Sequence, residues 1–131
     1  MGIFYRQSIA ITAGKQPTSG PVKEKIFEIP NYETIDVTSW GEAASQRFVV
    51  PDGSVDLPLS IGTIQEAEML AIRVDSVDLE LNVKLVNVNG TTVNLPLLPQ
   101  RTSIFHTKFS SILVTNTSGS AIEGVFFVAG D

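Results

Sequence analysis

The stretch VDLELNVKLVNVNGTTVNL, from Val77 to Leu95, decides the fold class of this chain. Every second residue of its first half is apolar, and the residues between them are charged or carry an amide. A period of two predicts a strand with one buried face and one solvated face. Asn89-Gly90 is a signal for a two-residue type I′ turn, so the sequence predicts a hairpin whose second strand spans residues 91–95.

The alternation changes phase after Leu85, which predicts a β-bulge at Leu85-Val86. Further short apolar segments, most of them alternating, occur at residues 4–12, 25–29, 34–40, 46–50, 55–59, 70–74, 112–114 and 122–128. Residues 42–45 and 65–70 have helical propensity but are too short for a stable helix. Eight to ten short strands separated by turn signals predict an all-β fold, a β-sandwich that is jelly-roll-like.

The first 24 residues differ from the rest. Residues 1–12 are rich in apolar side chains, and residues 13–24 are polar and rich in proline and glycine. We expect residues 1–24 to form an extended N-terminal arm with its tether, followed by one β-sandwich domain over residues 25–131. The arm must pack somewhere, on its own domain or on another chain.

Composition excludes several classes of protein. The 131 residues include no cysteine, so disulfides, thiolate zinc sites and a cysteine nucleophile are excluded. No apolar run approaches the roughly 20 residues that span a bilayer. Thr12 and Gly14 interrupt the apolar start, which argues against a secretory signal. The net charge of −5 argues against a nucleic-acid partner, because phosphate contacts need many Lys and Arg residues.

Charge is unevenly distributed along the chain. Residues 1–27 hold four basic residues and one acidic residue, whereas residues 28–80 hold eleven acidic residues and two basic ones. One interpretation is a solvated tail beside a solvated face. The other is that the basic arm lies on the acidic surface of a neighbouring subunit, where complementary charge fixes the register.

The sequence offers little chemistry for catalysis. His106 is the only histidine and has no partner nearby in sequence for general-base or metal chemistry, so a structural role is expected. Two pairs of carboxylates, Glu66 with Glu68 and Asp78 with Glu80, would each share a face of a strand, as in a small glycosidase. A solvated sheet face is the favoured explanation, because any such face places two carboxylates at a similar distance. We therefore expect that the chain is not an enzyme and that it has no catalytic, cofactor-binding or metal-binding site.

A carbohydrate-binding, lectin-like module is the alternative function. Trp40, Tyr5 and Tyr32 would form a sugar-stacking platform, although one Trp is few for a lectin and core or interface positions are favoured for these side chains. The Asp52–Asp56 segment offers hard oxygen ligands for calcium, but Pro51-Asp52-Gly53 is also a common turn sequence.

The end of the chain resembles a known group of proteins. The stretch Phe109 to Ile122, with Thr115-Asn116 before a Ser/Gly turn, is similar to the last strands of small all-β virion proteins of tailed bacteriophages. The segment 95–99, LPLLP, fits the same style, and the resemblance covers about residues 69–131. It implies a structural protein of the virion, made in the host cytoplasm: a capsid decoration or cement protein, a head-fibre base, or a tail or adaptor component.

Such proteins assemble as trimers or larger rings and on other virion proteins. The resemblance therefore implies a homo-oligomer, and the net charge and the lack of a long apolar run lead us to expect neither a nucleic-acid nor a membrane partner. Assembly is expected through the arm and through exposed edge strands. The residues expected to carry it are Ile3, Phe4, Tyr5, Arg6, Lys15, Lys23 and Lys25.

Overall fold

The structure, a computed structural model, describes residues 3–8, 11–15, 24–29, 32–37 and 41–131, and within these residues it is all-β without a helix. The chain divides into two compact units, Met1–Thr38 and Ser39–Asp131. The strands of the first unit are β1 (Ile3–Ser8), β2 (Ile11–Lys15), β3 (Glu24–Ile29) and β4 (Tyr32–Val37). Those of the second are β5 (Glu42–Val50), β6 (Ser54–Leu59), β7 (Ala67–Val74), β8 (Leu81–Val86), β9 (Thr92–Leu97), β10 (Thr102–Phe105), β11 (Ser111–Asn116) and β12 (Ile122–Gly130).

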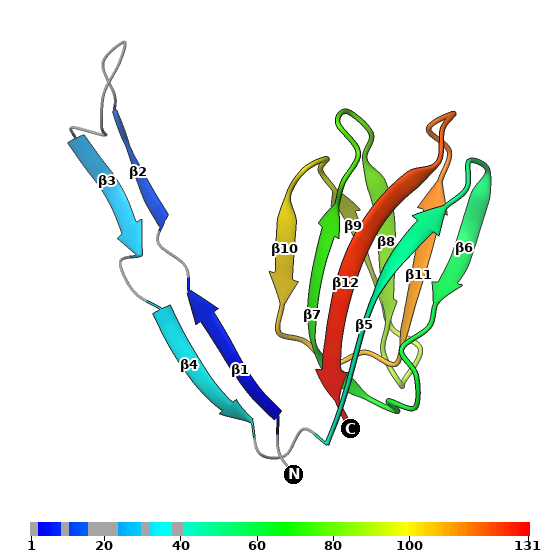
Figure 1. The fold of residues 1–131 in the computed structure, drawn as a ribbon, viewed down its shortest axis with the longest axis horizontal. Helices are drawn as coiled ribbons and strands as arrows, with labels where there is room; N and C mark the ends of the chain where they lie inside the picture. Colours follow the sequence, from blue (N-terminus) through cyan, green and yellow to red (C-terminus); the bar gives the residue numbers. More distant parts are fainter. Residues whose placement is uncertain (1–2, 9–10, 16–23, 30–31, 38–40) are drawn as a thin grey trace. The chain divides into compact units, whose positions relative to one another are not determined.

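The second unit is a β-sandwich of two antiparallel four-stranded sheets, ordered β10-β7-β12-β5 and β6-β11-β8-β9 (Figure 1). The first strand of the unit pairs with the last, β5 with β12, and the second with the last but one, β6 with β11. β7 pairs with β10 and β8 with β9 on the same scheme. A long antiparallel ribbon folded over into two sheets has this pairing, which is that of a jelly roll. The predicted fold class is confirmed.

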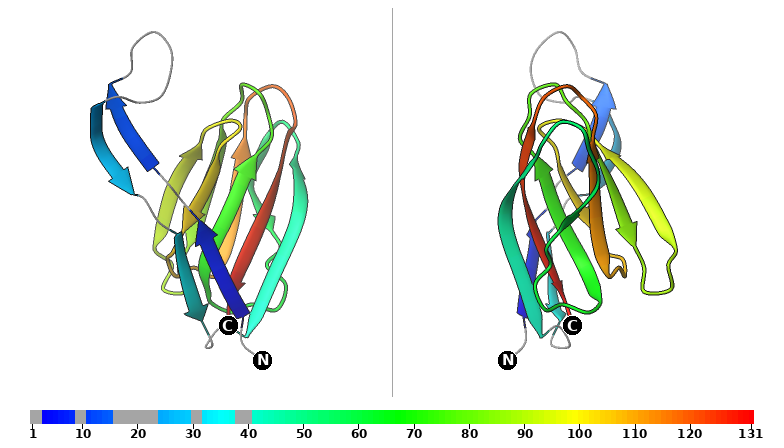
Figure 2. Two further views of the ribbon diagram at one scale, coloured as in Figure 1. Left: turned by 60° about the vertical axis from the view of Figure 1, so that its left-hand side comes forward. Right: turned by 90° about the vertical axis from the view of Figure 1, so that its right-hand side faces the viewer.

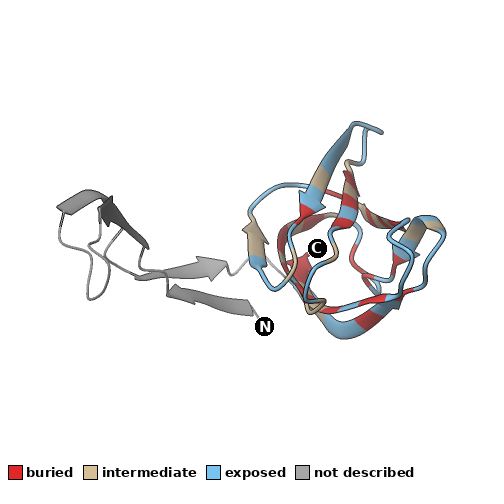
Figure 3. Ribbon diagram, turned by 90° about the horizontal axis from the view of Figure 1, so that it is seen from above, coloured by how far each residue is buried: buried red, intermediate tan, exposed pale blue. Residues whose placement is uncertain are grey.

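The two sheets face each other as two layers (Figure 2). Buried residues from both sheets form the core between them (Figure 3). Phe126 of β12 and Phe109, just before β11, are the largest fully buried side chains. Asn116, at the end of β11, is the one buried polar side chain among the described residues. Its amide nitrogen donates to the Val50 and Ser120 carbonyls at 2.9 and 2.8 Å, and its oxygen accepts from Ser118. Asn116 therefore ties the ends of strands from both sheets together.

The predicted hairpin is present, but its details differ from those expected. β8 begins at Leu81, and Val77 lies in the preceding loop with 76% of its surface exposed. No bulge interrupts β8, whose pairing with β9 is continuous. The turn has Gly90 at φ +86°, but Asn89 is not among the residues with positive φ, so it is not type I′. Five residues, 87–91, join the two strands, and Gly90 supplies the single left-handed position.

A bulge lies in β6 instead, and a second register shift lies at Glu68 in β7. Val114 pairs with Leu57 but Asn116 with Ser54, so two residues of β6 face one residue of β11. Asp56 occupies this bulge at φ +49°, and its backbone N–H donates to Thr115 Oγ1 at 3.0 Å. A side-chain acceptor on β11 thereby replaces the ladder bond that the bulge removes.

The first unit consists of two antiparallel strand pairs, β1 with β4 and β2 with β3. Its pairing groups residues 25–38 with the arm, so the division at Thr38/Ser39 lies fourteen residues beyond the domain boundary expected from the sequence. The predicted tether at 13–24 lies partly in β2, and residues 16–23 lie outside the described residues. No described segment is a helix long and apolar enough to cross a membrane.

Candidate assembly surface

The outer face of sheet β10-β7-β12-β5, called here the apolar face, carries one row of side chains from all four strands. Ala71 of β7 pairs with Ile104 of β10 and with Phe127 of β12, and Phe127 pairs with Ser45 of β5. Directly paired residues project on the same side of a sheet. These four residues therefore form a row that alternates large and small, Ile104–Ala71–Phe127–Ser45, called here the large–small row.

The accessible part of the apolar face is hollowed. A depression of about 200 Å³ lies on it, lined by Ser45, Ala71, Thr102, Val125 and Phe127 among others. Ala71, Val125 and Phe127 are half-buried, and Ser45 is exposed. Towards the C-terminal end of β12, Ala129 of the same face is fully buried. The small side chains of Ala71 and Ser45 account for the hollow beside the Phe127 ring.

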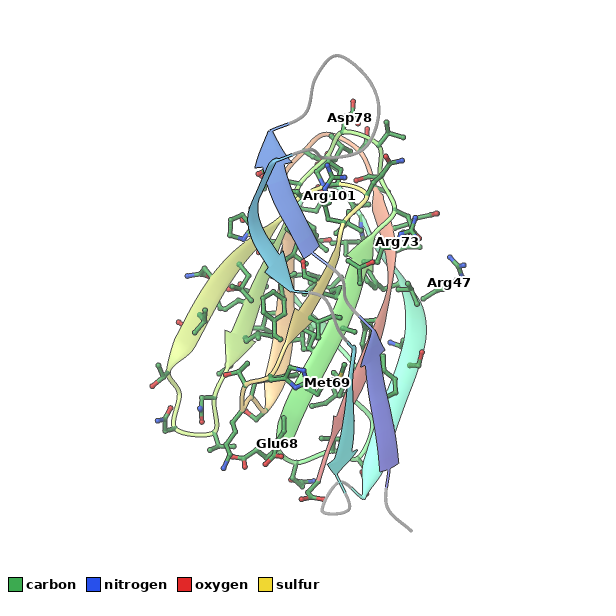
Figure 4. All side chains as sticks on the ribbon, turned by 90° about the vertical axis from the view of Figure 1, so that its left-hand side faces the viewer. Arg47, Glu68, Met69, Arg73, Asp78 and Arg101 are labelled. Carbon is green, nitrogen blue, oxygen red and sulfur yellow. The ribbon has the colours of Figure 1, made fainter. Side chains whose placement is uncertain are left out.

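Charged residues border the apolar face at one end. Arg73 Nε lies 3.1 Å from Asp75 Oδ1, and Arg47 Nη1 lies 3.7 Å from Asp75 Oδ2. Figure 4 shows Arg73 and Arg47 towards the end of β7 opposite to Glu68 and Met69. The Arg47 side chain is 83% exposed, so its ion pair is screened and contributes little stability.

The outer face of the other sheet, β6-β11-β8-β9, is called here the polar face. Lys84 of β8 projects from it and pairs with Asp56 Oδ1 at 3.1 Å. Asn82 of β8 and Asn94 of β9 are exposed on the same side, and Leu113 of β11 is half-buried. Pro58, Val86 and Pro96 project on the same side, so the polar face mixes polar and apolar side chains as ordinary protein surface does.

A second concave region lies along the seam between the edge strands β9 and β10. Two hollows of about 290 and 310 Å³ meet there, and Leu95 and Phe105 line both of them. Their rims carry Lys108 and His106 in the first and Arg101 in the second. The sandwich is thus less tightly closed along this seam than at its centre.

The predicted calcium segment has a structural role. Asp52 lies in the turn after β5, and its Oδ1 accepts from the Gly119 backbone N–H at 2.9 Å. Asp56 lies four residues on, in the β6 bulge, and pairs with Lys84. Both carboxylates therefore join neighbouring segments of the sandwich rather than converging on a common point.

The other acidic candidates do not form the predicted strand-face pairs. Glu66 precedes β7 and lies 3.8 Å from Lys108 Nζ, whereas Glu68 is within β7. Asp78 and Glu80 lie in the exposed loop before β8, so their predicted place on a strand is wrong. Within residues 41–131, no three acidic or histidine side chains gather where they would hold a metal ion.

Most of the predicted assembly residues belong to the first unit. Ile3, Phe4, Tyr5 and Arg6 lie in β1, Lys15 ends β2 and Lys25 is in β3, while Lys23 lies outside the described residues. The platform residue Trp40 is likewise outside them, and Tyr32 begins β4. The structure describes only the backbone of these strands, so the predicted roles of these side chains stay predictions.

The large–small row was not predicted, although the sequence carries a signal for it. Val125 to Ala129 and Met69 to Ile72 are uninterrupted apolar runs in the two central strands of one sheet. Runs of this kind are typical of strands that are covered on both faces, whereas strands with one wet face alternate.

In the comparisons with known proteins, no family model and no curated protein matches this chain.

Proposed function

We propose that this chain is a non-enzymatic structural protein of a bacteriophage virion, which assembles with copies of itself and with other proteins of the capsid or tail. The observation that carries the proposal is the jelly roll with one apolar outer face. The jelly roll is a common architecture of viral capsid domains. A hollow lined by apolar side chains such as Val125 and Phe127 on the outside of a sheet is typical of a contact site, so this patch favours assembly.

Two further observations support a structural role. Asp52, Asp56 and Glu66 each contact a backbone N–H or a lysine within the sandwich, so they serve its own architecture. The chain has no cysteine, and burial between subunits is one way for such a protein to gain stability without disulfides. The resemblance of residues 69–131 to small all-β virion proteins points to the same class.

Mass and particle shape test the proposal. The full chain and a chain lacking residues 1–24 are compared by multi-angle light scattering, and the full chain is imaged by electron microscopy. We expect a trimer or ring that dissociates when the arm is removed. In addition, purified phage particles should contain many copies of the chain. A monomer in both preparations, together with its absence from particles, would refute the proposal.

The carbohydrate-binding alternative has less support. Jelly rolls also include lectins, but Asp52 and Asp56 are engaged by the turn and by Lys84. Binding on a glycan array that is lost in Trp40→Ala would favour the lectin function.

A further inference from the structure

We propose that the apolar face forms a two-fold contact between two copies of this chain, in which Phe127 of each copy packs on Ala71 of the other. The inference rests on the self-assembly in the proposed function, and not on a place in the virion. A two-fold contact is compatible with a trimer or ring, because dihedral assemblies combine ring contacts with two-fold contacts.

The apolar runs of β7 and β12 are the first support. Phe126 and Val128 of β12 point into the core and are fully buried. Their neighbours Val125 and Phe127 point outward and are only half-buried, although they are as apolar as core residues. A central strand with this composition is typical of sheets that are covered on both sides. Met69 and Ala129 project from the same face and are fully buried, so the part of the face that a partner can cover is the region around Val125 and Phe127.

The large–small row explains why a second copy fits on this region. A two-fold contact requires a surface that is complementary to itself. β7 and β12 are the two middle strands, so an axis parallel to them and midway between them places β7 of one copy over β12 of the other. Phe127 then meets Ala71 and Ile104 meets Ser45, each large side chain over a small one. The depression of about 200 Å³ beside Phe127 is where the partner's ring would lie.

The neighbouring charges comprise two arginines and two carboxylates on each copy, and the same axis places Asp75 over Glu123 with Arg73 and Arg47 beside them. Arg73 pairs with both Val125 and Thr102, and Arg47 with Val125, so these four residues form the next row on the same face. The two-fold operation places Arg73 over Val125 and Arg47 over Thr102, so neither arginine meets its own copy. The aliphatic stem of Arg73 is suited to covering an apolar neighbour while its charged head stays with Asp75.

The size of the face sets the expected strength. β5, β7 and β12 have eight or nine residues each and β10 has four. With strands about 4.8 Å apart and about 3.3 Å per residue, the sheet covers roughly 480 Å² in projection. A standard stable interface buries about 800 Å² on each partner. We therefore expect concentration-dependent association, with a dissociation constant in the micromolar range or weaker.

Exchange of the large and small residues tests the contact. The full chain is studied by sedimentation velocity over a range of concentrations. Ala71→Phe places a second ring against Phe127 of the other copy, and Phe127→Ala leaves a small residue against Ala71. Each should raise the dissociation constant of this dimer by at least about tenfold. The double variant Ala71→Phe with Phe127→Ala exchanges the large and small positions and should restore association. Leu113→Ala, a half-buried outward residue on the polar face, is the matched control and should leave association unchanged.

A cross-link provides a second measurement that tolerates a poorly folding variant. The chain has no cysteine, so Ala71→Cys introduces a single thiol close to the proposed axis. Packed sheets lie about 10 Å apart, and a bismaleimide of about that span should join two copies rapidly. Asn82→Cys, on the exposed part of the polar face, is the control and should react without forming a dimer.

Several results would overturn the inference: a monomer at every concentration, single variants that associate as the native chain does, or a double variant that does not recover. Equal cross-linking of Ala71→Cys and Asn82→Cys would also overturn it. Failure here is distinguishable from failure of the proposed function. A chain present in virions whose Ala71→Cys variant does not cross-link disproves only the two-fold contact. A cross-linked dimer that is absent from virions disproves only the virion role.

Discussion

The two sheets of the sandwich share one core but have different outer faces. In β8, on the polar face, Asn82 and Lys84 alternate with buried Leu81 and Val83. In β12, on the apolar face, the residues between the buried ones are themselves apolar from position 125 to 129. The inward-facing side chains of both sheets form one hydrophobic core. The outward side chains of the two middle strands are therefore mostly apolar on the apolar face and mostly polar on the polar face.

This difference shows what an alternating pattern does and does not report. Alternation indicates that one face of a strand is wet, whereas loss of alternation indicates that the second face is covered. The direction in which a residue projects should therefore decide whether its replacement affects folding or association. The following variants test this, from the largest expected effect to the smallest.

Phe126 and Phe127 are adjacent in β12 and project from opposite faces. Phe126→Ala removes a fully buried ring and should lower the free energy of unfolding by about 3–5 kcal/mol. Phe127→Ala removes a half-buried ring and should cost the isolated subunit about 1 kcal/mol. Chemical denaturation at a low protein concentration, where the subunits are separate, measures both. Equal losses would show that the inside and outside of this sheet are wrongly assigned.

Replacement of buried Asn116 and of exposed Asn94 compares buried and exposed positions in the other sheet. Asn116→Asp removes two donated hydrogen bonds and buries a carboxylate beside the Val50 and Ser120 carbonyls. We expect a loss of about 2–4 kcal/mol, because a buried polar group without its partners is costly. Asn94→Asp, which is exposed on the polar face, should change stability by less than about 0.5 kcal/mol. Thermal unfolding followed by circular dichroism measures the contrast, and a tolerant Asn116 would contradict it.

Lys84→Met tests the polar face itself. The variant removes the ion pair with Asp56 but keeps most of the side-chain length. Since both partners are partly exposed, the loss should be at most about 1 kcal/mol and should shrink in high salt. Urea denaturation at low and high ionic strength measures it. A loss that is larger and independent of salt would mean that Lys84 has a structural role beyond the ion pair.

Much of the sandwich could be predicted because the local sequence pattern of each segment indicates a strand. The segments at 46–50, 55–59, 70–74, 112–114 and 122–128 all lie within strands. Residues 77–80 were misassigned, because alternation does not distinguish a strand from a loop that buries one side chain. Ser76 Oγ donates to the Leu79 carbonyl in that loop, and Leu79 packs against the core.

The candidate surface could not be predicted in the same way. β12 follows β11 after a short turn, yet it pairs with β5 and β7 in the opposite sheet. Pairing partners depend on contacts between residues far apart in the chain, and no local pattern reports them. The large–small row exists only because this register brings Ile104, Ala71, Phe127 and Ser45 into line.

The sequence by itself determined that this chain forms short strands, where most of them begin and end, and that two of them carry more apolar surface than one core can bury. Backbone sterics and the pattern of side-chain hydrophobicity involve residues that are close together in the chain, so the local sequence determines these properties. The tertiary structure alone decided which strands share a sheet, how the side chain of Asn116 at the end of β11 is hydrogen-bonded, and that the apolar runs of β7 and β12 lie side by side. Those outcomes depend on which distant segments best cover one another, and that choice belongs to the folded chain as a whole.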